Sequence, residues 1–194
     1  GMDLSHERKM SMKFADLVPC LVQEILPGDM FSVNTELMLR FAPLIAPVMH
    51  RINVYVHFFF VPNRIIWPEW EDFITGGVDG EDGTVMPTIA FSNPIGDNST
   101  LSDYLGIPPD NGTGTPLNVS QLPFRAYQAI YNEYYRDETL QTEVDITNIT
   151  QMRTLRKRCW EKDYYTSALP WTQRGPEVTL DMNIVYKDPA AYAV

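Results

Sequence analysis

Residues 51–63 have the sequence RINVYVHFFFVPN, and the alternation of their side chains is the strongest structural signal in the chain. At the period of two that a β-strand imposes, one face carries Ile52, Val54, Val56, Phe58 and Phe60, and the other carries Tyr55, His57, Phe59 and Val61. Both faces are largely apolar, and β-branched and aromatic residues are typical of strands. We therefore predict a central strand, ended by Pro62 and Asn63, that is covered on both sides by other layers or by other subunits.

The size and composition of the chain predict one folded domain with long irregular connections. The chain has 194 residues, of which 44% are hydrophobic, and it contains 15 prolines and 11 glycines. A chain of this length can bury a substantial core, whereas this much proline and glycine indicates many turns. No apolar run approaches the ~20 residues needed to span a bilayer, so we expect no membrane insertion.

The formal charge of −10 is unevenly distributed. Residues 65–124 contain nine acidic residues and no lysine or arginine. Within them, residues 76–122 are rich in glycine, proline and asparagine, which predicts an acidic, solvated, loop-rich insertion. Because its acidity would repel nucleic acid, we expect any contact with a polyanion to come from the flanking thirds of the chain. We predict that the insertion faces outward, where it would contact a receptor on the host surface.

Other segments predict further strands and short helices. Apolar extended stretches at 16–25, 30–34, 36–41 and 178–186 are candidate strands. A short helix is predicted from Pro68 to the glycines at 76 and 77, with Trp67, Trp70 and Phe73 on one face. A second short helix, at 101–105, would be capped by Ser99 or Thr100 and ended by Gly106.

The longest predicted helix begins at Pro123 and opens a helical segment at about 123–163. Helical spacing predicts a buried face of Phe124, Tyr127, Ile130, Tyr131 and Tyr134, with Arg125, Gln128, Asn132 and Glu133 on the solvent face. Tyrosines in such a stripe usually pack against a core with their hydroxyl groups at its rim.

Residues 152–162, MRTLRKRCWEK, are the candidate nucleic-acid-binding segment. We expect them to lie on a helix that presents Arg153, Arg156, Lys157, Arg158 and Trp160. Basic side chains neutralise phosphates, and an indole stacks on an unpaired base, as in loose binding of single strands. The alternative is a solvated helix surface whose basic residues pair with neighbouring carboxylates.

Catalytic and metal-binding patterns are weak. The three histidines, at 6, 50 and 57, have no ligand-like spacing. Glu69, Glu71 and Asp72 offer paired carboxylates for glycoside hydrolysis, but on a short helix they converge poorly, and the helix dipole explains acids at a helix start. We predict a protein without enzymatic activity, metal or cofactor.

Several long stretches resemble the major capsid proteins of the Microviridae, the small single-stranded-DNA bacteriophages, and in particular their gokushovirus-like and prophage-related branch. The stretches that carry the resemblance are DLSHERKMSMKFADLVPCLVQEILPGD, MHRINVYVHFFFVPNRIIWPEWEDFITGG, LSDYLGIP, LPFRAYQAIYNEYYRDETL and RCWEKDYYTSALPWTQRGPEV. Together they cover most of residues 3–178 in the expected order.

The resemblance implies a mainly β fold, the eight-stranded viral jelly-roll β-sandwich, with large insertions. It implies self-assembly through pentamers into an icosahedral shell around single-stranded DNA, in virions assembled in the host bacterial cytoplasm. Aromatic residues of the strand and the helices would then contact other subunits: Phe58, Phe59, Phe60, Trp67, Trp70, Tyr131 and Tyr134. The basic segment would face the genome.

The chain departs from this family in two respects. Family members are much longer, and we find only four or five candidate strands where a jelly roll needs eight. Past Val178 the sequence no longer follows the family pattern; a natural short form, a truncated prophage gene and a joining of distant segments would each account for this. The alternative function is a carbohydrate-binding jelly-roll module that stacks sugars on Trp67, Trp70 and Trp171.

Overall fold

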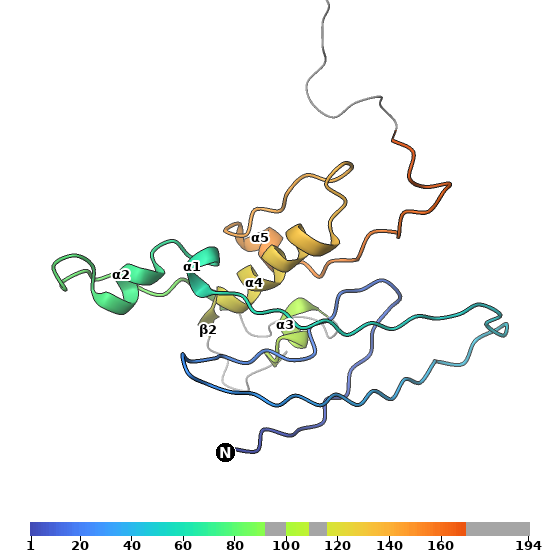
Figure 1. Cartoon of the computed structure of the whole chain (residues 1–194), viewed down its shortest axis with the longest axis horizontal. Coiled ribbons are helices and arrows are strands. Elements are labelled where there is room, and N and C mark those ends of the chain that lie inside the picture. Colours follow the sequence, from blue (N-terminus) through green and yellow to red (C-terminus); the bar gives the residue numbers. More distant parts are fainter. Residues whose placement is uncertain (92–99, 109–115, 170–194) are drawn as a thin grey trace, which may run out of the picture. The chain divides into compact units, whose positions relative to one another are not determined.

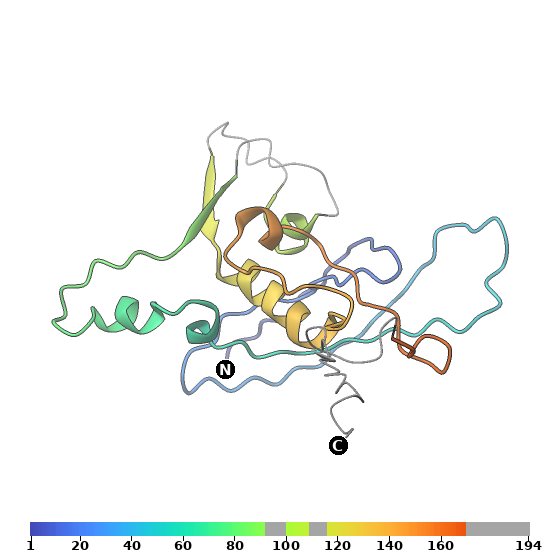
Figure 2. The ribbon, with the colours of Figure 1, turned by 90° about the horizontal axis from the view of Figure 1, so that it is seen from above.

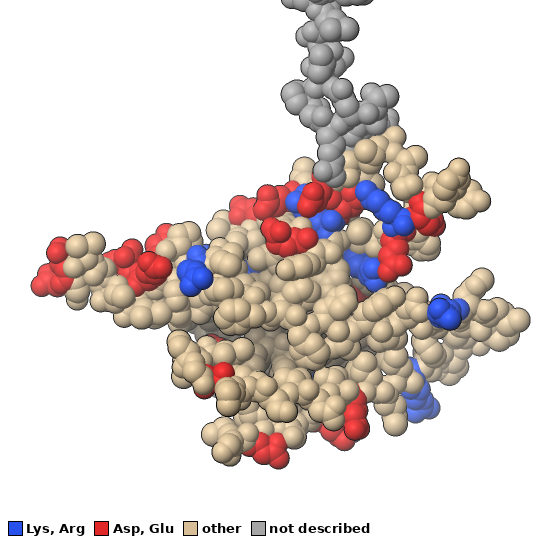
Figure 3. All heavy atoms as spheres, in the orientation of Figure 1, with Lys and Arg blue, Asp and Glu red and all other residues tan. Residues whose placement is uncertain are grey.

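The computed structural model describes residues 1–91, 100–108 and 116–169. Gly1–Cys159 forms one compact unit and Trp160–Val194 a second, and the elements below belong to the first. Figures 1 and 2 show them along the chain: α1 (Asn63–Ile66), α2 (Trp70–Thr75), β1 (Thr88–Phe91), α3 (Leu101–Tyr104), β2 (Leu117–Ser120), α4 (Leu122–Ile130), the π-helical turn η1 (Tyr131–Tyr135) and α5 (Ile149–Met152). None of the helices in the described ranges is long and apolar enough to cross a membrane. On the face drawn in Figure 3, uncharged side chains make up most of the surface.

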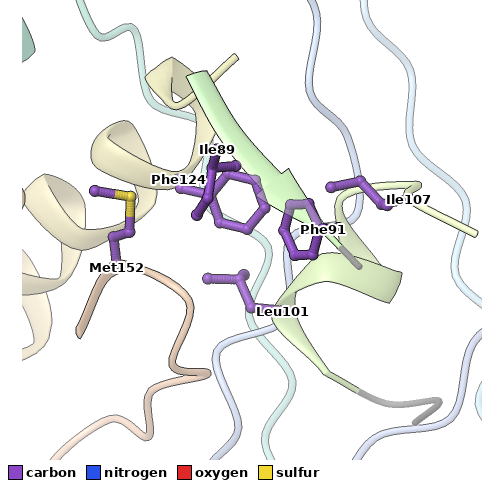
Figure 4. Packing of buried hydrophobic residues seen from close by; sticks show 6 residues of the cluster. All are labelled: Ile89, Phe91, Leu101, Ile107, Phe124 and Met152. Atoms are coloured by element: carbon purple, nitrogen blue, oxygen red, sulfur yellow. The ribbon is translucent and has the colours of Figure 1, made fainter. Parts of the chain in front are cut away.

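The main core lies against an antiparallel pair of strands. β1 pairs with β2 so that Thr88 lies opposite Ser120 and Phe91 opposite Leu117. Alternate residues of β1 point inward, so Ile89 and Phe91 are buried while their neighbours are exposed. Figure 4 shows how this cluster packs; it comprises Ile89, Phe91, Leu101, Ile107, Phe124 and Met152.

This core corrects the prediction for residues 76–122. Both strands, α3 and Ile107 come from the stretch that we expected to be a solvated insertion. The prediction of a solvated segment was wrong for these residues. Each of their apolar runs is only a few residues long, so the surrounding acidic and turn-forming residues determine the average composition on which the prediction was based. The exposed character holds for the loop before β1, where Val78 and Val85 are exposed.

Two predicted helix ends are confirmed. The Thr100 side chain accepts a hydrogen bond from the amide of Asp103 and so caps α3. At the end of α2, Gly76 has a φ of 78°, and a Cβ there would lie 3.0 Å from the Gly80 carbonyl oxygen, so glycine is required. Pro68 does not begin α2, which starts two residues later.

The buried face of α4 and η1 differs from the prediction. Phe124 and Tyr131 are buried as expected, but Tyr134 is exposed. Arg125, Gln128 and Asn132, which we placed on the solvent face, are buried. Together with Gln121 and Leu122 these residues still follow helical spacing, so the stripe exists but is rotated around the helix.

Hydrogen bonds explain why polar side chains can occupy this stripe. The Gln121 side chain donates to the Thr88 carbonyl, and its oxygen accepts two bonds from Arg125. Arg125 also donates to the Ile66 carbonyl at 3.2 Å. Burial lowers the pKa of Arg125, although Glu69 and Asp145 oppose this effect. Because these polar groups have hydrogen-bond partners, they can be buried. Their bonds join α4 to β1 and to α1.

A second apolar cluster lies around Ile66, Trp67 and Leu122, with Trp70 and Ala126 packed against it. The rings of Trp67, Trp70 and Phe73 contact one another at centroid distances of 5.2 to 5.9 Å, as their spacing predicts. Because Trp67 belongs to the buried core, it anchors α1 and α2 to α4.

Residues 51–62 do not form the predicted central strand. They are without regular structure, and α1 begins at Asn63. The other candidate strands at 16–25, 30–34 and 36–41 are also irregular, apart from a single bridge between Asp16 and Lys157. An extended segment becomes a strand only when a neighbouring backbone pairs with it, and the part of this chain that the structure describes supplies no such neighbour. The candidate strand at 178–186 lies outside the described residues.

Candidate nucleic-acid and subunit interfaces

The basic segment is not the helix that we predicted. α5 is capped by Asn148, whose side chain accepts hydrogen bonds from the amides of Thr150 and Gln151, and it ends at Met152. Residues 153–158 continue as irregular chain. Hydrogen bonds to α4 and to the N-terminal residues hold this backbone in an irregular conformation instead of a helix.

Gln128 on α4 is the centre of this arrangement. Its buried side chain donates to the carbonyl oxygens of Met152 and Thr154 at 3.0 and 2.9 Å. Its own oxygen accepts a bond of 2.8 Å from Nε of Arg156. Arg156 also donates to the Gln151 carbonyl, and its guanidinium lies over the ring of Tyr131. This amide group therefore holds residues 152–156 against α4.

The other basic side chains divide into packed and exposed ones. The guanidinium of Arg153 lies 4.2 Å from the ring centre of Phe91, and that of Arg158 lies 5.5 Å from the ring centre of Tyr55. Lys157 is exposed, although its backbone bridges to Asp16. Trp160, in the second unit, is 76% exposed. Of the five predicted residues, Lys157 and Trp160 present the most accessible side chains.

The N-terminal residues also bind the basic segment. Leu17 donates its amide to the Arg156 carbonyl, and Arg158 donates to the Ala15 carbonyl, both at 2.9 Å. The Tyr127 hydroxyl donates to the Leu17 carbonyl and accepts from the Arg156 amide. This hydroxyl therefore joins the helix to both segments.

We expect Tyr127 to make the stability of the protein fall at high pH. Burial raises the pKa of Tyr127 from 10.0 to about 12, despite the opposing effect of Arg156. Below pH 10 neither state ionises and the full stability is present. Between pH 10 and 12 the unfolded tyrosine loses its proton while the folded one does not, which costs about 2–3 kcal/mol.

Urea unfolding between pH 8 and 12 measures this effect as the difference between the wild type and Tyr127→Phe. The variant lacks the ionisable group, so its stability should fall less steeply above pH 10. Tyr164→Phe is the control, because Tyr164 is exposed. Parallel curves for the wild type and Tyr127→Phe would contradict the assignment.

The odd-numbered rings of residues 57–59 pack on η1. The rings of His57 and Tyr135 stack at 5.9 Å, with Nδ1 and the hydroxyl oxygen 2.5 Å apart in a hydrogen bond. Phe59 contacts Tyr134 at 4.9 Å and also meets Tyr135. Burial raises the pKa of Tyr135, and Arg158 opposes that shift. The odd-numbered rings therefore contact η1, but burial does not alternate along residues 54–60, because half-buried Val56 lies between exposed neighbours.

The predicted subunit-interface residues fall into two groups. Trp67 and Tyr131 are buried within the chain, and Trp70 is half-buried. Phe58, Phe60 and Tyr134 are exposed to 60%, 73% and 68%, and Phe59 to 36%. Only the second group presents an apolar surface to another molecule. Trp67, at 4% exposure, is also inaccessible as a platform for stacking sugars, and Trp171 lies outside the described residues.

The sequence prediction missed the residues that organise the site, namely Gln121, Arg125, Gln128 and Asn132. Asn132 donates to and accepts from the backbone of Val144, and so holds the loop after η1. Their spacing of four, three and four residues is a helical stripe in its own right. This signal was available, but polarity led us to place the stripe in solvent. Within the described ranges, no group of three or more histidine, cysteine or acidic side chains is arranged to hold a metal ion.

Comparison with known proteins gives a consistent result. A family model described as capsid protein (F protein) matches residues 1–191. The chain is 36% identical over 192 residues to capsid protein VP1 of Bdellovibrio phage phiMH2K, covering 95% of this chain and 35% of the phage protein. It is 35% identical over 206 residues to capsid protein VP1 of Chlamydia phage 1, covering 92% and 34%. It is 27% identical over 199 residues to capsid protein VP1 of Spiroplasma virus 4, covering 92% and 35%. The chain thus spans about a third of the length of these relatives.

Proposed function

Because this chain belongs to the capsid protein (F protein) family, we propose that it is a structural part of a virion shell that self-assembles around single-stranded DNA. The family match over residues 1–191 carries the proposal. The names of the relatives from three phages, each a capsid protein, support it. The role is structural rather than enzymatic, and the protein acts in the virion after assembly in the host cytoplasm.

The proposed architecture is the viral jelly roll, with this chain as one capsid-like domain. The family match supports a mainly β capsid fold, and among the described residues β1 and β2 form a pair of strands against which the main core packs. Copies would associate through pentamers into an icosahedral shell. The exposed aromatic side chains of Phe58, Phe60 and Tyr134 support this, because apolar groups on a surface favour association.

Size-exclusion chromatography with electron microscopy tests the proposal. We expect symmetric oligomers or shells that form from the purified chain, with no turnover of glycan substrates. A protein that remains monomeric over the whole accessible concentration range would contradict shell building. Binding to a glycan array that is lost on Trp70→Ala would favour the carbohydrate-binding alternative instead.

We further propose that the basic segment contacts the genome from the inner surface. Arg153, Arg156 and Arg158 already make internal contacts, so their charge would act from fixed positions. Lys157, in the first unit, would contact a phosphate, and Trp160, in the second, would stack on a base.

Lys157→Gln should weaken binding of single-stranded DNA and lower the salt dependence of log K by about 0.7 for the lost phosphate contact. Fluorescence anisotropy at several salt concentrations measures this slope. Lys13→Gln is the matched control, because Lys13 is also exposed but lies outside the segment. An affinity that does not change between low and high salt would contradict phosphate contact.

The acidic loop between α2 and β1 is the proposed contact with a host-surface receptor. Residues 76–87 include exposed Val78 and Val85 and contain no basic residue. Brief protease treatment of intact particles should cleave there if the loop faces outward. Full protection of the loop in particles would contradict this placement.

A further inference from the structure

We propose that the N-terminal arm, which we define as residues 8–17, is exchanged between copies of this chain. In the exchanged arrangement the arm of one copy lies on α3, α4 and residues 156–158 of a neighbouring copy. This inference rests on the proposed function, because it requires copies to associate. It adds to that function a named segment and the surface that receives it.

The first part of the receiving surface is Tyr104, at the end of α3. Its carbonyl oxygen accepts a hydrogen bond from the guanidinium of Arg8. Its hydroxyl group donates to the Ser11 carbonyl at 2.5 Å, and the residue is only 4% exposed. The backbone and the side chain of one buried residue therefore both hold the arm.

The second part of the receiving surface is the backbone of residues 156–158 together with the Tyr127 hydroxyl group. These groups bind Ala15 and Leu17 through three hydrogen bonds of 2.9 Å, and Asp16 forms a β-bridge to the same segment. Ala15 has a φ of 69°, in the left-handed region that favours glycine. A strained residue persists where its surroundings fix it, so the surface receives the arm in one defined shape.

A weakly held tether joins the arm to the rest of its own chain. Residues 20–51 are all exposed. Among the described residues, the hydrogen bonds of residues 18–54 stay within that stretch except for one, which Arg8 donates to the Cys20 carbonyl. Since Arg8 belongs to the arm, this bond moves with it. The arm and its tether can therefore leave the receiving surface together without breaking hydrogen bonds of the tether.

The tether is also long enough to reach a neighbouring copy. When fully extended, residues 18–54 span up to roughly 120 Å, whereas a domain of this size has a radius of gyration of about 15 Å. A neighbour's arm offers the same atoms to the receiving surface, so exchange keeps every bond described above. Once copies lie side by side, the neighbour's arm reaches an effective concentration comparable to that of the chain's own arm. Self-association can thus convert these contacts into contacts between copies.

A zero-length cross-link between Asp16 and Lys157 reports which copy supplies the arm. The two residues are bridge partners, so their side chains lie on the same side of the pairing, where a carbodiimide can join carboxylate to amine. Unlabelled and ¹⁵N-labelled wild-type chains are mixed in equal amounts in urea, refolded together and cross-linked as oligomers. If every arm is exchanged, about half of the linked peptides will combine one light and one heavy partner in mass spectrometry. Linked peptides that are only fully light or fully heavy would overturn the proposal.

A disulfide trap gives a second measurement, in a background that carries Cys20→Ser and Cys159→Ser. Antiparallel partners have Cα atoms about 4.5–5.5 Å apart, which suits a disulfide. Mild oxidation of mixed Asp16→Cys and Lys157→Cys chains should therefore give covalent heterodimers. The control is Asp16→Cys mixed with Glu71→Cys, at an exposed position on α2, and should give about tenfold less heterodimer. Equal yields from the two mixtures, or no heterodimer from either, would overturn the proposal.

Two neighbouring substitutions test how the arm is seated. Arg8→Ala removes the bonds to the carbonyl groups of Tyr104 and Cys20, so the yield of mixed cross-links should fall severalfold. Lys9→Ala is the matched control, because it deletes the same charge from an exposed side chain whose ion-pair partner is Glu7. The control should leave the yield unchanged. Equal losses for the two variants would contradict the described seating of the arm.

The outcomes separate this inference from the proposed function. Oligomers or shells in which every chain keeps its own arm would reject only the exchange. Mixed cross-links in a closed dimer that never builds larger particles would confirm the exchange and reject only the shell-forming role. A chain that stays monomeric at every concentration would reject both.

Discussion

Gln128→Leu is expected to lower the free energy of unfolding by about 3–5 kcal/mol, because it removes three hydrogen bonds from a buried site. Gln128 is 0% exposed, and leucine has a similar volume, so packing is largely kept. The substitution leaves the carbonyl groups of Met152 and Thr154 and the guanidinium of Arg156 without this partner. Arg156 keeps its bond to the Gln151 carbonyl, so the buried Met152 carbonyl that loses its donor is the largest part of the expected loss.

Urea denaturation followed by tryptophan fluorescence measures the effect. Gln23→Leu is the matched control, because Gln23 is exposed, and its stability should lie within about 0.5 kcal/mol of the wild type. A loss of less than 1 kcal/mol for Gln128→Leu would show that the bonds at this site contribute little to stability. Proteolysis near residues 153–158 should also become faster in the variant, because its backbone is released from α4.

Phe124→Ala is expected to lower the free energy of unfolding by about 3–5 kcal/mol. Phe124 is 1% exposed, lies 6.0 Å from the ring centre of Phe91, and joins α4 to the strand pair. Truncation leaves a cavity in the main core, which Ile89, Leu101 and Met152 line. Since a domain has a total stability of about 5–15 kcal/mol, the variant should be partly unfolded at moderate temperature.

Phe60→Ala is the control for this prediction, since it deletes the same ring at a position that is 73% exposed. Its stability in the isolated chain should change by no more than about 0.5 kcal/mol. Thermal unfolding followed by circular dichroism compares the two variants. Equal losses at both positions would mean that residues 51–62 pack more closely than the structure shows.

Local signals in the sequence predicted the short elements well. The cap at Thr100, the glycine end at Gly76 and the ring cluster around Trp67 depend on contacts within a few residues, so a linear pattern is enough to specify them. The long helix was also predicted, and α4 with η1 covers most of its first half.

Features that depend on distant partners were predicted poorly. Burial of Arg125 and Gln128 requires acceptors on α1 and after α5, and neither partner is visible from the helix sequence. α5 ends at Met152, and the basic segment after it is not helical, because its backbone bonds to residues that are distant in the sequence. For residues 51–62 the apolar pattern predicted a strand, but a strand also needs a second backbone, and the local sequence cannot supply it.

The bond between Tyr127 and Leu17 joins residues 110 positions apart, and it has a consequence for synthesis on the ribosome. At roughly 5–20 residues per second, the first residues wait on the order of 5–20 s before their helix is translated. During that interval the apolar side chains of the nascent polypeptide lack their partners. Chaperone engagement is therefore expected soon after the first sixty residues emerge, and ribosome profiling of chaperone-bound nascent chains would detect it.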